Sequence, residues 1–113
     1  MKVWEKAHAL TLEVYKAVEG FPRQELYSFT NQIQRAAVSV PANIAEGCGK
    51  SGDAEFGRYL KIAMGSSSEL EYLLLLAHDL NYLNGETYKG LSGNLVETRK
   101  MLNSLIQKLK SNS

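Results

Sequence analysis

The stretch that decides the fold is QRAAVSVPANIAEG, residues 34–47. It places Pro41 inside an alanine-rich pattern with helical spacing. Because the spacing continues through the proline without a phase shift, we predict one helix that kinks there, where a backbone donor is missing and the ring clashes with the preceding turn. The apolar positions that carry this spacing are Ile33, Ala37, Val40 and Ile44.

Working outward, the proline-containing pattern begins around residues 23–26 and ends at a glycine-rich loop, residues 47–52. A helix is predicted before it over residues 3–19, closed by Gly20-Phe21-Pro22, since glycine suits a helix C-cap and proline cannot continue the ladder. Two further helices are predicted, over about residues 53–83 and 86–109. No strand pattern or long linker interrupts this order.

Each predicted helix carries an apolar stripe with steps of three and four residues, as core packing requires. The stripes are Val3, Ala7, Leu10, Val14 and Val18; then Phe56, Leu60, Ala63, Ser67, Leu70, Leu74 and Ala77; then Tyr88, Leu91, Leu95, Thr98, Leu102, Leu105 and Leu109. Trp4, Leu12 and Tyr15 widen the first stripe, which suggests burial on a second side or contact with a partner. We predict one all-α domain over residues 1–113, an antiparallel up-down-up-down four-helix bundle with a proline-kinked second helix.

Composition is typical of a globular protein, with 113 residues, 44% hydrophobic and 22% charged. No apolar run approaches the ~20 residues that cross a bilayer, so we expect no membrane partner. The single cysteine, Cys48, and the absence of a signal-peptide pattern favour a cytoplasmic location. The formal net charge of +1 supplies no global attraction to nucleic acid.

Polar residues surround the proline stretch and form a candidate structural network. They would satisfy groups near the kink and fix the register of neighbouring helices or subunits. The alternative is a ligand or catalytic site built on perturbed carboxylates. The five residues are Arg35, Ser39, Asn43, Glu46 and Glu69.

A second candidate group lies at the start of the third predicted helix and in the loop before it. Its cations and aromatic ring are suited to contact with phosphate or nucleic acid, whereas a solvated face balanced by Asp53 and Glu55 is the alternative. The group consists of Lys50, Arg58, Tyr59 and Lys61.

Catalytic and metal-binding motifs are not supported by the residue spacing. Gly49-Lys50-Ser51 resembles the end of a phosphate loop, but it follows a helix and lacks the first glycine. A di-iron bundle needs two Glu-x-x-His pairs, and only Glu5 with His8 matches. We therefore predict no catalytic residues, no metal and no cofactor.

Several motifs together identify a family resemblance across almost the whole chain. They are Trp4-x-Lys6-Ala7, Phe21-Pro22, residues 32–47, Glu55-Phe56 with Arg58-Tyr59-Leu60, and Ala63-x-Gly65-Ser66-x-Ser68-Glu69-Leu70-Glu71. This set resembles the four-helix-bundle family named for proteins encoded in intervening sequences of 23S ribosomal RNA genes. The resemblance implies a four-helix bundle that assembles as a homopentameric ring.

A more distant resemblance is to the accessory variability protein of diversity-generating retroelements, which implies nucleic-acid and reverse-transcriptase binding by a basic pentameric barrel. This chain lacks that strongly basic character. We expect a non-catalytic homo-oligomer, by resemblance a pentamer, that serves as an accessory factor for RNA, DNA or a ribonucleoprotein. The alternative is a protein-interaction scaffold without nucleic-acid binding. An enzyme using Glu46 and Glu69 would need an accessible pocket around both.

Overall fold

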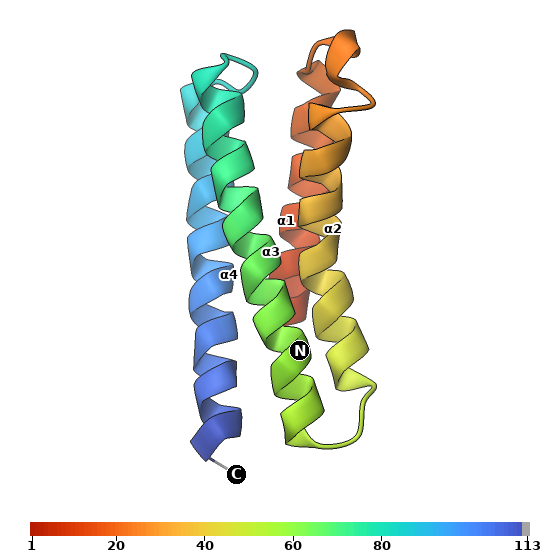
Figure 1. Cartoon of the computed structure of the whole chain (residues 1–113). Helices are drawn as coiled ribbons and strands as arrows, with labels where there is room; N and C mark the ends of the chain where they lie inside the picture. Colours follow the sequence, from red (N-terminus) through yellow and green to blue (C-terminus); the bar gives the residue numbers. More distant parts are fainter. Residues whose placement is uncertain (112–113) are drawn as a thin grey trace.

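A computed structural model describes residues 1–111, and all regular structure within them is helical. Figure 1 shows the long helices side by side, with connections alternating between the two ends of the molecule. The prediction of an all-α four-helix bundle is confirmed. The helices are α1 (Lys2–Ala17), α2 (Phe29–Cys48), α3 (Asp53–Asp79) and α4 (Gly85–Ser111), with short 3-10 helices η1 (Val18–Gly20) and η2 (Arg23–Glu25) between α1 and α2.

Contacts between the helices give their relative direction. Lys6 of α1 pairs with Glu97 of α4, and further along α1 Glu13 accepts a hydrogen bond from Asn94. Residue numbers rise along α1 as they fall along α4, so these helices are antiparallel. α2 and α3 are antiparallel in the same way, since Ser39 contacts Ser66 and Gly47 lies against Tyr59. So are α3 and α4, since Glu71 contacts Arg99 and His78 stacks on Tyr88.

The core follows the predicted stripes with two differences. In α1 and α3 the stripe positions are buried except Phe56, which is half-buried. In α4 the last buried position is Ile106, whereas the predicted Tyr88, Leu105 and Leu109 are half-buried. A straight helix has 3.6 residues per turn, so a strict seven-residue pattern drifts off the core face within a few turns.

Two predicted boundaries were wrong. The second helix begins at Phe29, because residues 23–25 form the separate 3-10 turn η2. The third helix ends at Asp79, where Asn81 takes a positive φ of 65°. Asn81 N–H donates to the His78 carbonyl and Tyr82 N–H donates to the Ala77 carbonyl. These two hydrogen bonds are the pair that defines a Schellman cap.

Pro41 lies within α2, which continues through it as one helix, so division into two helices is excluded; the kink stays a prediction. The missing proline N–H would leave the Ala37 carbonyl without its helical donor. The buried Thr11 hydroxyl of α1 lies 3.1 Å from that oxygen and 2.9 Å from the Ala7 carbonyl, and shares its proton between them. Thr11 is a partner that sequence reasoning missed.

Candidate nucleic-acid and protein interfaces

The polar network beside Pro41 is smaller than predicted. The Asn43 side-chain amide donates to the Ser39 carbonyl at 2.8 Å and to its hydroxyl at 3.0 Å. The Ser39 hydroxyl is in turn hydrogen-bonded to the Ser66 hydroxyl at 2.7 Å, which joins α2 to α3. These three half-buried side chains set the register of the two helices.

The other three predicted members are exposed, and none is hydrogen-bonded to the Ser39, Asn43 or Ser66 side chains. Glu46 pairs with Lys50, whose ammonium lies 3.8 Å from its carboxylate. Arg35 and Glu69 line a surface depression of about 410 Å³ between α2 and α3 that also touches Ser39. The five residues therefore do not form one network within the chain, which corrects that expectation. Glu46 does not line the depression that holds Glu69, so this depression does not bring the two carboxylates together.

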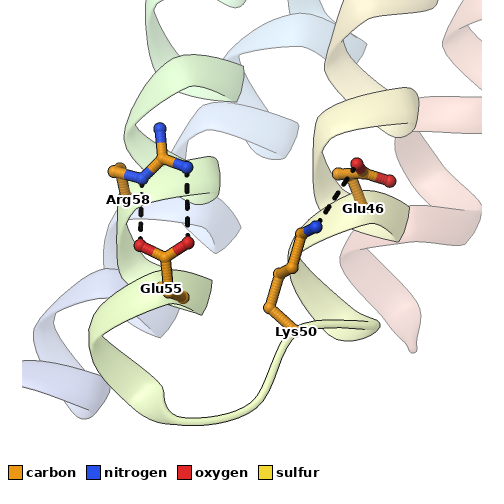
Figure 2. Close-up of polar contacts among 4 residues, drawn as sticks. All are labelled: Glu46, Lys50, Glu55 and Arg58. Atoms are coloured by element: carbon orange, nitrogen blue, oxygen red, sulfur yellow. Dashed lines mark hydrogen bonds and ion pairs between the residues drawn. The ribbon is translucent and has the colours of Figure 1, made fainter.

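Near the C-terminal end of α2, two cations lie close to one aromatic ring. Arg58 is 4.6 Å from the centre of the Tyr59 ring and Lys50 is 5.7 Å from it. Figure 2 shows that each cation also pairs with a carboxylate: Lys50, in the α2–α3 loop, with Glu46 of α2, and Arg58 with Glu55, both in α3. The structure thus brings together three of the four residues predicted to contact phosphate, in a charge-balanced arrangement.

The Arg58–Glu55 pair has two hydrogen bonds, at 3.1 and 3.3 Å. The bond from Arg58, helped by its charge, lowers the pKa of Glu55, and the bond to Glu55 raises the pKa of Arg58. Both groups are therefore charged at neutral pH. Because exposed ion pairs contribute little net stability, a phosphate can replace the carboxylate at small cost.

Lys61 and Arg58 both line a depression of about 250 Å³ between α3 and α4. Lys110 of α4 lines the same depression, with Asp53 on the α3 side. Sequence reasoning missed the contribution of α4, because Lys61 and Lys110 are far apart in the chain and only the register of the bundle places them together.

Charge is unevenly distributed along the bundle. We divide the bundle near the contacts of Lys6 with Glu97 and of Ser39 with Ser66. Arg99 lies close to this boundary, because it binds Glu71 and Ser68 of the other half. On the side of the α2–α3 connection, residues 1–8, 40–66 and 97–111 carry nine Lys or Arg and five Asp or Glu, a net charge of +4. The other half, residues 9–39 and 67–96, carries four and seven, a net charge of −3. The small total of +1 conceals this separation. We call the first half the basic half and the second the acidic half.

An apolar groove runs along the outside of α1 and α2, with a volume of about 480 Å³. Trp4, Leu12 and Tyr15, the residues that widened the first stripe, form its α1 wall. His8 stacks on Trp4 at 5.0 Å between ring centres. The remaining lining residues are Thr11, Val38, Pro41, Ala42 and Ala45, so no Asp, Glu, Lys or Arg reaches the groove.

Exposed apolar side chains also occur on the α3 and α4 side, at Tyr72, Leu75 and Val96. Within residues 1–111, no group of three or more His, Cys, Asp or Glu side chains is arranged to hold a metal ion. None of the helices in the described part of the chain is both long and apolar enough to cross a membrane.

Comparison with known proteins yields one family and one informative structure. The family described as 23S rRNA-intervening sequence protein matches residues 1–104. A crystal structure of a protein of unknown function from the S23 ribosomal protein family of Bacteroides thetaiotaomicron is similar, with 29% sequence identity and a TM-score of 0.82. The alignment covers 92% of this chain and 97% of that chain. No curated protein matches the chain.

Proposed function

The chain belongs to the 23S rRNA-intervening sequence protein family, and from this premise we propose that it is a non-catalytic, self-associating bundle protein that binds RNA or DNA through its basic half. The observation that carries the proposal is the separation of charge along the bundle, +4 against −3. Nucleic-acid binding depends on local cation density and not on the total charge of the chain.

The chemistry of the basic half suits a single-stranded polyanion. Arg58 and Lys61 provide cations for phosphate, and Tyr59 provides an aromatic ring on which a base can stack after one cation moves aside. Both ion pairs there are exposed, so exchanging a carboxylate for a phosphate disturbs no buried structure.

Self-association is supported by the apolar groove of α1 and α2. Leu12 is 59% exposed although the core of the bundle is already complete without it. The exposed Tyr72, Leu75 and Val96 side chains of α3 and α4 are the candidate contact for the groove on another copy. Two different faces in contact generate a ring when the rotation closes, and a pentamer would repeat the basic half five times.

A titration with short single-stranded RNA tests the nucleic-acid part. We expect binding that weakens between about 50 and 200 mM salt, with a slope that falls by about two when Arg58→Ala and Lys61→Ala are combined. The matched control is Lys16→Ala with Lys89→Ala, which removes two exposed cations from the acidic half. No binding at low salt, or equal losses in both double variants, contradicts the proposal.

A mass measurement in solution tests self-association. Five chains of 12.6 kDa give about 63 kDa. Leu12→Glu should lower the mass, because it places a charge in the apolar groove. Lys16→Glu puts the same charge on the same helix outside the groove and should leave the mass unchanged. A wild-type monomer at micromolar concentration is the opposing result.

A protein-interaction scaffold is the second candidate, and the uncharged lining of the groove favours it. In that case the occupant is the apolar face of a different protein. Co-purification of one defined protein after nuclease treatment, abolished by Leu12→Glu, together with a monomeric pure chain, would support the scaffold over the self-associating nucleic-acid binder.

A further inference from the structure

A separate pocket of about 400 Å³ lies where α1, the η1–η2 connection and α2 meet. Its apolar walls include Val18, Phe21 and Leu26. Glu19 and Arg23 are its only charged lining residues, one of each sign, so the pocket offers no net attraction for a charged ligand. A volume of this size is within the range of small-molecule sites, about 300–1,000 Å³.

Thr30 of α2 also lines this pocket and carries an unsatisfied hydroxyl. The residue is only 4% exposed, and its Oγ1 has no hydrogen-bond partner among the described residues. Buried polar groups are nearly always paired, because leaving one without a partner is costly. The hydroxyl can both donate and accept, so a ligand bearing either kind of polar atom can satisfy it.

The apolar wall is aromatic and held in place. The Phe21 ring lies 5.9 Å from the Phe29 ring and 5.4 Å from the Tyr82 ring, centre to centre. A ligand ring would therefore meet a fixed aromatic surface, where offset or edge contacts add to the free energy of burial. Thr30 Oγ1 is covered in the structure, so a ligand reaches it only after a lining side chain, such as that of the exposed Leu26, shifts.

We propose that this pocket binds a small uncharged aromatic compound with a hydroxyl group, which hydrogen-bonds to Thr30 Oγ1 while its ring packs on Phe21. The inference does not depend on the proposed function, because Phe21 and Thr30, which carry it, line neither the basic half nor the apolar groove; Tyr15 lines both the pocket and the groove. It follows from a pocket with an aromatic wall and a buried, unpaired hydroxyl, whose polar rim includes Glu19, Arg23 and Gln34.

The test is a titration of the full chain with phenol, followed by the amide NMR shifts of Phe21, Leu26 and Thr30. We expect saturable shifts at these residues. Thr30→Val keeps the shape of the side chain and removes the hydroxyl, so it should weaken phenol binding about tenfold. Thr30→Ser keeps the hydroxyl and should retain most of the affinity.

Benzene is the matched ligand without a hydroxyl. We expect wild type to bind phenol more tightly than benzene, and Thr30→Val to remove this preference. Absence of saturable shifts, or equal binding of phenol and benzene by wild type, overturns the proposal even if the valine variant fails to fold. Phenol affinity that is unchanged in a folded Thr30→Val variant overturns it as well.

Discussion

The two ends of the bundle are held together by different kinds of contact. At the end with η1 and η2, side chains distant in sequence meet: the rings of Phe21, Phe29 and Tyr82 cluster, and the Tyr82 hydroxyl donates to Glu25 at 2.8 Å. At the α2–α3 end, the ion pairs join residues only three or four positions apart. Long-range polar and aromatic contacts close one end, whereas at the other end a buried apolar cluster holds the helices together and the ion pairs are local and exposed.

The largest loss of stability is expected for Gly47→Ala, at the α2–α3 end of the bundle. A Cβ added at Gly47 would lie 2.8 Å from Tyr59 Cβ and 2.9 Å from Phe56 Cδ1. Since Tyr59 Cβ is attached directly to the backbone, the helices must separate, and Gly47→Ala should lower the free energy of unfolding by about 2–3 kcal/mol. Urea denaturation measures the change. Gly49→Ala, whose nearest atom would be 3.6 Å away, is the control, and equal stability of both variants would refute the close approach.

A smaller loss of stability is expected midway between the ends, where the Thr11 hydroxyl donates to the Ala37 carbonyl, which has no helical donor because residue 41 is proline. Thr11→Val should lower stability by about 1–2 kcal/mol, because the buried Ala37 carbonyl loses that donor. In a Pro41→Ala background the helical N–H returns to Ala37, so the cost of Thr11→Val should shrink. A double-mutant cycle measured by denaturation checks this, and strictly additive losses would contradict it.

The aromatic end should lose stability at alkaline pH through Tyr82. The hydrogen bond to Glu25 raises the pKa of Tyr82, so the folded state holds the phenol proton more tightly than the unfolded chain does. The stabilisation is complete below the unfolded value of about 10 and is lost as the pH rises through the higher folded value.

Tyr82→Phe cannot make this bond or ionise. The Tm advantage of wild type over the variant should therefore be constant near neutral pH and should shrink above about pH 10. Tyr72→Phe, at an exposed tyrosine of α3, controls for the general effect of alkaline pH. An advantage that persists undiminished at the highest pH at which the chain stays folded would argue against the bond.

The smallest effect on stability is expected for Glu55→Gln, which removes the exposed ion pair with Arg58 at the α2–α3 end. The exposed pair with Arg58 contributes little to folding, so Tm should hardly change. Freeing the guanidinium should nevertheless tighten RNA binding about threefold at low salt. Glu86→Gln on the acidic half is the control, and equal gains in both variants would point to net charge alone.

The candidate sites differ in how far sequence reasoning reached them. Lys50, Arg58 and Tyr59 are within ten positions, so their proximity followed from one loop and one helix turn. The bond between Ser39 and Ser66 and the bond from Thr11 to Ala37 depend on the register of separate helices. Register follows from how side chains interlock across the interface, and a single-helix pattern does not contain that information.

The amino-acid sequence by itself determined the four helices and the apolar stripes on α1, α2 and α3, because helical periodicity and the end signals at Gly20 and Pro22 are local properties of the chain. Only the tertiary structure decided which polar groups meet, which apolar side chains stay exposed in a groove, and how a chain of net charge +1 divides into halves of +4 and −3. Those properties depend on which residues of different helices lie at the same level and on the same side of the bundle, and packing between helices sets that alignment.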